Sequence, residues 1–342
     1  MKQTKVAIIG AGPAGSTCAL LLRKKGIDCV LIDRAAFPRD KICGGGLTPR
    51  SYRLLDQLLP QFKYDYNSVR RLKLCIEGEE VLDFEMAEEI RIVKRRLFDA
   101  QLLEAYKQQG GLFINEAMTG IEEKDGQIIV TLKSGRQLVC QYVVGADGAN
   151  SKVRKYLNPK CSHGILCMEQ YGPKSADNAI IGNLSKDYRQ GYYYSFPNET
   201  SDVQGFGDMA TTPASYRRVL DDMGCPSLKA LGAYIPQSTD YPLRNHIILI
   251  GDAGGFPNRL TFEGIYYALL TASHAATAIS SGRPFSVVNR KVFDNKRKEE
   301  RFARLFYSDT GLKMLRFFCK NAPTVVTWLF NKAAKQRGHE FS

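Results

Sequence analysis

The amino-acid sequence predicts an α/β protein with a Rossmann-like nucleotide-binding domain, a second domain built on an antiparallel sheet, and a C-terminal helical tail. Three observations support this prediction. A strand, a glycine turn, a helix and a second strand follow one another from Lys5 to Arg34. Two later strands also run into glycine turns, at Tyr142 to Ser151 and Asn245 to Gly255. The stretches between them alternate apolar and polar residues, as half-buried strands do.

The domain boundaries follow from this order. We expect a discontinuous nucleotide domain, a second domain made of two insertions, and a basic tail. The nucleotide domain comprises residues 1–62, 92–158 and 244–290, the second domain residues 63–91 and 159–243, and the tail residues 291–342.

The composition limits the class of protein. At 342 residues the chain is long enough for two domains. Its 48 Lys and Arg exceed its 35 Asp and Glu, and a net charge of +13 suggests an anionic ligand, a membrane surface or nucleic acid. Nine cysteines without metal-ligand spacing indicate reduced thiols in the cytoplasm and no metal site. No signal peptide is expected, and no run approaches the ~20 apolar residues of a membrane span.

The first glycine turn has the spacing of a dinucleotide-binding motif. Val6 to Ile9 forms the strand, and the helix runs on to Lys25. Gly10 permits the tight turn, Gly12 lets the backbone approach a pyrophosphate, and Gly15 lets the helix pack closely on the strand. The phosphates then meet the helix N-terminus, beside Ala14.

An acidic residue completes this motif. Asp33 ends the second strand at the distance expected of a carboxylate that binds a ribose hydroxyl, with Arg34 next to it. The ADP part of FAD or NAD is therefore the predicted ligand.

The following loop contains three consecutive glycines, Gly44, Gly45 and Gly46. They indicate either close contact with a flat ligand or a flexible linker. Cys43 precedes them and is either a small buried side chain or a thiol beside that ligand.

The next segments predict a hairpin and a helix. Arg70 to Glu85 alternates about a turn at Glu77 and Gly78. Arg91 to Asp99 opens a helix that ends at Gln109, with inward side chains Leu97, Phe98, Leu102, Leu103 and Tyr106. Cations at a helix start oppose its dipole, so Arg95 is expected to meet a phosphate, or else to lie on a solvated face.

The middle of the chain adds a meander and an aromatic strand. Short strands lie at 121–123, 128–132 and 138–140. Asp147 follows in a glycine turn that suits a ribose or a bound water, although such turns select Asp for themselves. Tyr192 and Tyr194 lie in a strand whose aromatic residues line a cavity or pack in the core. A helix is expected at 213–223.

The last third of the chain is expected to contribute a strand and a helix to the nucleotide domain and then to form the tail. A strand runs into Gly251 and Asp252, and a helix starts near Gly264 and Ile265 and reaches Ser280. The tail mixes Lys and Arg with large apolar residues. Two readings are open: helices that lie in a membrane interface, or helices whose apolar stripe packs on the nucleotide domain.

With these motifs laid out, the chain resembles the FAD-dependent oxidoreductases of the para-hydroxybenzoate hydroxylase fold, and within them the geranylgeranyl reductase family. The superfamily signatures occur in order as GAGPAG with Asp33, GADGANSKVR from Gly145 and LIGDAGG from Leu249. KICGGGL, the helix start at Arg95, LTFEGIYYA from Leu260 and GYYYSFP from Gly191 are similar to motifs of the reductase family. Tyr194 and Phe262 depart from its pattern, which usually has Trp and Gly there.

The resemblance implies FAD as the cofactor and a role for each matched residue. Asp33 would bind the adenosine ribose, Arg95 the phosphate and ribose region, and Asp252, after Gly251, the ribityl and pyrophosphate groups. Gly264 and Ile265 would direct backbone N–H groups to the N1 and O2 edge of the flavin, where a helix N-terminus stabilises negative charge. Cys43 and the three glycines would border the isoalloxazine ring. Cys43 is the first candidate for a proton donor, followed by Tyr192 and Tyr194.

The expected reaction is hydride transfer from reduced flavin to a carbon–carbon double bond of an apolar isoprenoid or prenylated lipid. Because the chain has one dinucleotide motif, the reductant is expected to be transiently docked NAD(P)H or a reduced carrier protein. A flavin monooxygenase that hydroxylates an apolar or aromatic substrate is the first alternative, and a non-catalytic flavin-binding regulator is the second. Halogenation is disfavoured because Trp328 is the only tryptophan.

The expected location is the cytoplasm, with peripheral attachment to the inner face of the membrane as a further hypothesis. No nucleic-acid partner is expected, because the basic residues of the tail accompany large apolar ones and the sequence has no nucleic-acid-binding module.

Overall fold

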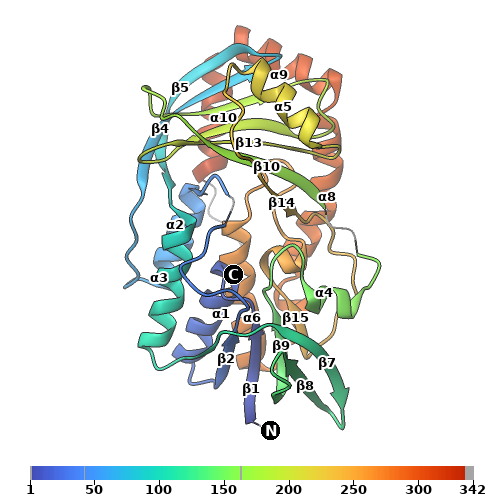
Figure 1. Cartoon of the computed structure of the whole chain (residues 1–342). Coiled ribbons are helices and arrows are strands. Elements are labelled where there is room, and N and C mark those ends of the chain that lie inside the picture. Colours follow the sequence, from blue (N-terminus) through green and yellow to red (C-terminus); the bar gives the residue numbers. More distant parts are fainter. Residues whose placement is uncertain (1, 42, 162–163, 336–342) are drawn as a thin grey trace.

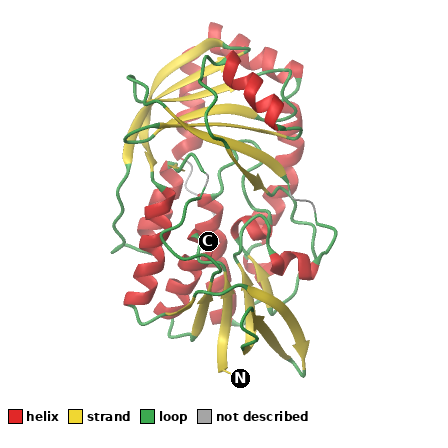
Figure 2. Ribbon diagram, viewed as in Figure 1, coloured by secondary structure: helices red, strands yellow, loops and turns green. Residues whose placement is uncertain are grey.

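The computed structural model describes residues 2–41, 43–161 and 164–335. Its strands form two separate sheets, one towards each end of the molecule, with loops and helices between them (Figure 2). This arrangement confirms the predicted α/β fold, because the first sheet carries the nucleotide-binding motif and a separate sheet is built mainly from later segments, with the short strand at Gly46–Leu47 added at its edge. None of the helices in the described residues is both long and apolar enough to cross a membrane.

The first sheet has seven strands around the N-terminal strand β1 (Lys2–Ile9). The strand β1 pairs in parallel with β2 and with β9, and β15 pairs in parallel with the last part of β9. The strands β7, β8 and the first part of β9 form the predicted antiparallel meander. The other bounds are β2 Cys29–Ile32, β6 Leu112–Ile114, β7 Met118–Lys124, β8 Gln127–Leu132, β9 Gln137–Gly145 and β15 Ile247–Leu249.

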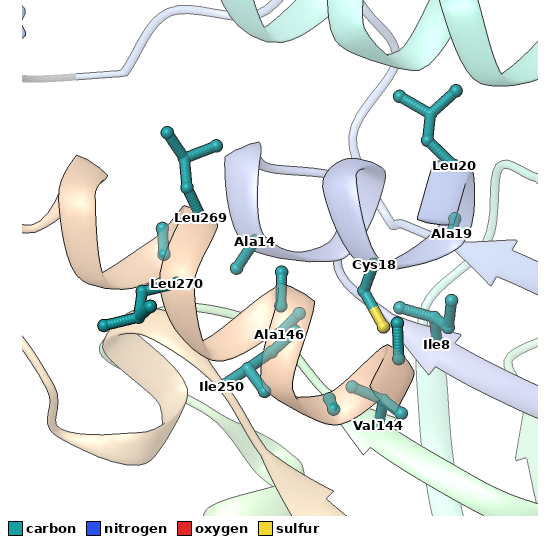
Figure 3. Close-up of a cluster of buried hydrophobic side chains, with 14 of the residues drawn as sticks. Ile8, Ala14, Cys18, Ala19, Leu20, Val144, Ala146, Ile250, Leu269 and Leu270 are labelled. Carbon is teal, nitrogen blue, oxygen red and sulfur yellow. The ribbon is translucent and has the colours of Figure 1, made fainter. Parts of the chain in front are cut away.

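Helices α1 (Pro13–Lys24) and α6 (Ile265–Ser281) pack together and on this sheet. Ala14 and Cys18 of α1 lie between α6, with Leu269, and the strands, with Val144 (Figure 3). Small side chains let the helix backbones approach closely, which holds the glycine turn rigidly at the strand ends. The remaining elements of this part are α2 Pro49–Leu58, α3 Arg95–Gln108, α4 Lys152–Leu157, the short 3-10 helix η1 Gly251–Gly254 and α7 Phe285–Val288.

The second sheet has eight strands in the order β14-β10-β13-β12-β11-β4-β5-β3. All neighbouring pairs are antiparallel except β4 and β11, which run parallel, so the sheet is mixed. Its strands are β3 Gly46–Leu47, β4 Asn67–Ile76, β5 Glu79–Ile92, β10 Ile165–Gly172, β11 Ala179–Leu184, β12 Tyr192–Pro197, β13 Asp202–Asp208 and β14 Leu231–Ile235. The helix α5 (Pro213–Asp222) packs against Tyr193 and Phe206 of this sheet.

The tail forms three helices, α8 (Arg290–Phe306), α9 (Asp309–Asn321) and α10 (Pro323–Lys335). They lie along the second sheet (Figure 1). Ala303, Tyr307, Leu312 and Cys319 are buried against this sheet, and Phe330 meets Phe84 edge-to-face at 5.3 Å. The reading in which an apolar stripe of the tail packs on the nucleotide domain holds only for the start of α8, where Val292 and Phe293 join the core of that domain, whereas the rest of the tail packs mainly on the second sheet. Residues 336–342 of the predicted tail lie outside the described residues.

Three local predictions can be compared directly. The turn of the β4–β5 hairpin is at Glu77 and Gly78, both with positive φ, as predicted. The helix α3 begins only at Arg95, because Arg91 continues β5. The predicted inward orientation of Leu97 is wrong, since its side chain is 45% exposed.

Candidate functional site

A cavity of about 1330 Å³ lies between the two sheets. Its walls come from the carboxyl ends of β1, β2 and β9, from the glycine loop, and from one face of the second sheet. Sixteen of the predicted site residues line it, namely Gly10, Gly12, Ala14, Asp33, Arg34, Cys43, Gly44, Gly45, Gly46, Arg95, Asp147, Tyr192, Tyr194, Asp252, Gly264 and Ile265. Gly15 and Gly251 are not among the lining residues.

The glycines of the first turn have different structural roles. A Cβ on Gly15 would lie 1.8 Å from the carbonyl oxygen of Gly10, so this glycine allows α1 to pack on the turn. Gly10 has a φ of +105°. A Cβ on Gly12 would meet only the Arg39 Nη2, at 3.6 Å. The protein itself therefore has room for a Cβ at Gly12, which fits a position kept open for a ligand in the cavity.

Asp33 is fixed at the end of β2 by two backbone donors. Its Oδ2 accepts from the Ala11 N–H at 2.7 Å and its Oδ1 from the Ala35 N–H at 2.8 Å. Each carboxylate oxygen keeps a second lone pair, and the side chain lines the cavity. This geometry fits a carboxylate that receives hydroxyl groups of a ribose.

Asp147 holds α4 and leaves one oxygen without a partner. Its Oδ2 accepts from the Lys152 N–H at 2.7 Å and from the Val153 N–H at 3.4 Å. Within the described part of the chain, the buried Oδ1 accepts no hydrogen bond. Burial raises the pKa of this carboxyl above its usual range. An orphaned acceptor at the cavity fits a donor group from the ligand, such as a ribityl or ribose hydroxyl.

The N-terminus of α6 provides the complementary positive end. Gly264 precedes a helix of 17 residues whose first turn contains no acidic side chain. A Cβ on Gly264 would lie 3.3 Å from the Asp252 Oδ1. The N-terminus of this helix therefore opens onto the cavity beside Gly264 and Ile265, where its positive end favours a ligand edge that gains negative charge.

Arg95 is more constrained than the sequence indicated. Its guanidinium makes two hydrogen bonds with Asp99, at 2.8 and 2.9 Å, and interacts with Cys43. Asp99 is fully buried and pairs also with Arg39 at 3.3 Å. Asp99 thus relieves the conflict with the helix dipole. Arg39, which the sequence reasoning missed, is the more exposed cation beside Gly12 and the better placed to meet a pyrophosphate.

The glycine loop owes its composition to close packing. A Cβ on Gly44 or Gly46 would lie 2.8 or 2.9 Å from the ring of Phe196, and one on Gly45 would lie 2.2 Å from the Val93 carbonyl oxygen. The loop is therefore pressed against the second sheet, with its backbone along the cavity. Neither a linker nor ligand contact alone accounts for all three glycines.

Glu263 joins this loop region to α6, a contact that the sequence reasoning missed. Its carboxylate accepts hydrogen bonds from Thr48, Ser51 and the Arg50 guanidinium, with the Arg50 Nε at 2.9 Å and the Ser51 Oγ at 2.8 Å. The Arg50 guanidinium also lies 4.4 Å from the centroid of the Tyr266 ring. This network fixes the start of α2 against the start of α6, where the ligand edge is expected.

Aromatic and acidic residues of the second sheet form the inner wall. Tyr192 stacks on Phe262 at 5.0 Å, and its hydroxyl donates to the Thr261 carbonyl oxygen. The Tyr194 hydroxyl donates to the Glu169 carboxylate and lies 3.1 Å from the Cys167 sulfur. Glu169 was also missed, although an acidic residue within the apolar run Ile165–Gly172 is a visible signal.

The far part of the cavity is apolar. It is bounded by the second sheet on one side and by the tail helices on the other. The sheet contributes Leu72, Leu74, Leu82, Phe84, Ile180 and Leu184, and the tail contributes Phe302, Phe306, Leu315, Val326 and Phe330. We call this part the apolar chamber. In the described residues no cluster of His, Cys, Asp and Glu side chains is arranged to hold a metal ion.

Comparisons with known proteins identify an FAD-binding domain in the N-terminal part of the chain. Residues 3–166 match the family model described as FAD binding domain. The chain is 30% identical to an uncharacterized protein of Methanosarcina barkeri, over 94% of this chain and 86% of that protein. It is 29% identical to a menaquinone reductase of Mycobacterium tuberculosis (83% and 82% covered) and 28% identical to a geranylgeranyl diphosphate reductase of Rhodobacter capsulatus (81% and 76%).

Solved structures show the same fold. A geranylgeranyl bacteriochlorophyll reductase-like protein of Thermoplasma acidophilum superposes with a TM-score of 0.79 at 19% identity, over 99% of this chain and 98% of that one. A halogenase in complex with phloroglucinol and FAD superposes with a TM-score of 0.74 at 15% identity, over 96% and 85%. At these identities the likeness concerns the fold alone and does not identify the reaction.

Proposed function

Because the chain belongs to the geranylgeranyl reductase family of FAD-dependent oxidoreductases, we propose that it reduces carbon–carbon double bonds of an apolar isoprenoid or prenylated lipid. The observation that carries this proposal is the continuity of one cavity from the nucleotide-binding turn to the apolar chamber. A long hydrocarbon chain fits such a chamber, whereas a small polar substrate would leave most of its apolar surface unfilled.

The residues around the turn fit FAD. Gly12 and Arg39 would meet the pyrophosphate, Asp33 the adenosine ribose, and Asp147 the remaining hydroxyl groups. When bound, FAD supplies the hydride from its reduced isoalloxazine ring. The N-terminus of α6 favours the negative charge that reduction places on the ring edge.

The walls of the apolar chamber would position the alkene and exclude water. The sheet presents its aliphatic face, and the tail helices close the opposite side, so a substrate chain is desolvated along its length. The reductant, NAD(P)H or a reduced carrier protein, would dock transiently, since the sequence has a single dinucleotide motif.

Anaerobic turnover tests this function. The FAD-loaded protein, reduced with dithionite, is mixed with geranylgeranyl diphosphate or a prenylated quinone, and the product mass is measured. We expect a gain of two mass units for each reduced double bond. A gain of sixteen that requires oxygen would instead establish the monooxygenase. Failure to transfer electrons to any alkene, quinone or oxygen would establish the non-catalytic flavin-binding regulator.

A variant pair links the reaction to the apolar chamber. Leu74→Trp narrows the chamber on β4, whereas Leu74→Met conserves volume. We expect Leu74→Trp to retain FAD and to lose turnover of long-chain alkenes by at least tenfold, and Leu74→Met to stay near wild type. Equal turnover by both variants would place the substrate elsewhere.

We also propose that the tail helices attach the protein peripherally to an anionic membrane. Large apolar side chains are exposed on all three helices, including Phe302 and Leu305 on α8, Phe317 on α9, and Trp328 on α10. The same helices wall the apolar chamber, so a lipid substrate would enter close to the bilayer. Residues 291–335 contain eleven Lys and Arg against four Asp and Glu, which suits anionic headgroups.

A further inference from the structure

Glu169 is a buried carboxyl at the centre of the site. It lies on β10, lines the cavity, and is 6% exposed. The Tyr194 hydroxyl donates to its carboxylate from the neighbouring part of the sheet, and the Gly44 N–H donates to it from the glycine loop. A carboxyl therefore bridges the inner wall and the loop that is expected to border the flavin.

The sheet is shaped to hold this pair. A Cβ on Gly205 of β13 would lie 2.3 Å from the ring of Tyr194, so the glycine provides the space that the tyrosine occupies. The Cys167 sulfur lies 3.1 Å from the same hydroxyl. Glu169 thus has a fixed partner and a fixed direction into the cavity.

The charged and titratable groups around Glu169 come from every element that packs against it. They are Lys41 and Cys43 in the loop, Arg95 on α3, Cys167 and Tyr171 on β10, Tyr194 on β12, and Tyr216 on α5. Burial raises the pKa of Glu169 to about 7, although Tyr194, Lys41, Arg95 and the Gly44 N–H oppose this rise. Both protonation states are therefore populated near neutral pH.

The other candidates for proton donation, the hydroxyl groups of Tyr192 and Tyr194 and the thiol of Cys43, are less suited to this role than the Glu169 carboxyl. The Tyr192 hydroxyl donates to the Thr261 carbonyl oxygen, and the Tyr194 hydroxyl donates to Glu169. Burial raises the pKa of both phenols well above the ordinary value, so each holds its proton tightly. The Cys43 sulfur accepts from the Gly45 N–H at 3.4 Å and lies against Arg95.

We propose that Glu169 donates the proton that completes reduction of the double bond, while Tyr194 positions its carboxyl. The step rests on the proposed function. Hydride from the reduced flavin forms a C–H bond at one alkene carbon, and the π bond breaks. The O–H bond of Glu169 breaks as its proton forms a C–H bond at the other carbon. Reduced FAD, when bound, would supply the hydride and its two electrons, and donation of the proton would leave Glu169 as a carboxylate that solvent reprotonates.

The first test detects the proton on the Glu169 carboxyl by spectroscopy and requires no turnover. Infrared spectra of the FAD-loaded protein should show a protonated-carboxyl C=O band that disappears with a midpoint near pH 7, and Glu169→Gln should lack this band. Tyr194→Phe removes a hydrogen bond that favours the carboxylate, so the midpoint should move to higher pH. The absence of any such band in the wild-type protein above pH 5 would overturn the proposal.

The second test uses anaerobic alkene reduction. Glu169→Gln should retain FAD and lower kcat by about 10²- to 10⁴-fold, with KM nearly unchanged and the limb of the pH profile near pH 7 lost. Cys43→Ser should keep that limb. If the wild-type enzyme is active and Glu169→Gln has the same kcat, the proposed role of Glu169 is wrong, whereas the proposed function stands. Loss of the limb in Cys43→Ser would assign the proton to the thiol. An inactive wild-type enzyme would overturn both the function and this role.

Discussion

Phe262 stacks on Tyr192 with ring centroids 5.0 Å apart and ring planes 17° apart, although Phe262 has a φ of +56°. This backbone region is costly for any residue with a Cβ. Both rings line the cavity at the junction between the expected flavin position and the apolar chamber. The strained conformation therefore holds an aromatic ring against Tyr192 on the cavity wall.

Two substitutions separate the strain from the stacking. Phe262→Ala and Phe262→Gly both remove the ring contact, but only glycine relieves the backbone. We expect the glycine variant to be more stable than the alanine variant by about 1 kcal/mol, as measured by denaturant unfolding. If the two variants unfold at the same denaturant concentration, the backbone at this position is not strained.

The glycine turn gives a second matched pair. Gly12→Val should fold normally and lose FAD, because the valine side chain would occupy space that only the ligand needs. Gly15→Val should lower the unfolding temperature of the protein itself, because its Cβ would collide with the Gly10 carbonyl oxygen. Flavin absorbance after gel filtration and thermal unfolding measure the two effects. A Gly12→Val protein with full flavin content would show that no part of the ligand approaches this glycine closely.

The contrast between these positions also explains how far the sequence could predict the site. The glycine turn, Asp33 and the start of α6 are local signals, and each occupies a segment of about thirty residues or fewer. The partners of Glu263 lie more than 200 residues away in the sequence, and Tyr194 lies 25 residues from Glu169. No periodicity encodes such pairs, because they depend on which elements the fold brings together: β10 and β12 of the second sheet for Glu169 and Tyr194, and the starts of α6 and α2 for Glu263 and its partners.

The tail also shows that sequence periodicity does not determine which face of a helix is buried. Its helical pattern predicted one apolar stripe, but α9 has two apolar regions. Leu312 and Cys319 of α9 are buried against the second sheet, whereas Met314 and Phe317 are exposed. Lys296 looked like a surface cation and is in fact buried, with its ammonium bound to the Pro257 carbonyl oxygen and to Glu299. Which face of a helix is covered is decided by the surface that it meets.

The pH dependence of stability gives a further prediction for Glu169. Burial raises its pKa from 4.5 to about 7, so between these values the folded state binds more protons than the unfolded state. Its stabilising contribution is present below pH 4.5 and is lost as the pH rises through 7. In Glu169→Gln, the fall in unfolding free energy between pH 5 and pH 8 should be smaller by on the order of 2–3 kcal/mol.

Denaturant unfolding at the two pH values measures this difference. Asp83→Asn is the matched control, because the hydrogen bond from Arg71 lowers the pKa of Asp83. The contribution of Asp83 to stability is lost only as the pH falls below the ordinary pKa of an aspartate. The difference in unfolding free energy between pH 5 and pH 8 should therefore be the same in Asp83→Asn as in the wild type. If the unfolding free energy falls by the same amount in the wild type and in Glu169→Gln, the pKa of Glu169 is the same in the folded and unfolded states.

The exposed stripes of the tail lead to the prediction for membranes. Met314, Phe317 and Phe318 are exposed at i, i+3 and i+4 on α9, and Val325, Trp328 and Leu329 are exposed in the same pattern on α10. Side chains at these spacings share one face of a helix. Several cations of the tail already pair with acidic groups, as Arg316 and Lys320 do with Glu79. Membrane affinity should therefore depend on the apolar stripes as well as on charge.

Sedimentation with liposomes separates these two contributions. The wild-type protein should bind anionic vesicles more than neutral ones at low salt, since each free cation near the surface adds about 1 kcal/mol, and added salt should weaken this preference. The double variant Phe317→Ser, Trp328→Ser should bind anionic vesicles at least tenfold more weakly. The control Leu243→Ser changes a similarly exposed apolar residue outside the tail and should bind like the wild type. Equal binding to both lipids at low salt would exclude the charge contribution, and unchanged binding by the double variant would exclude the stripes.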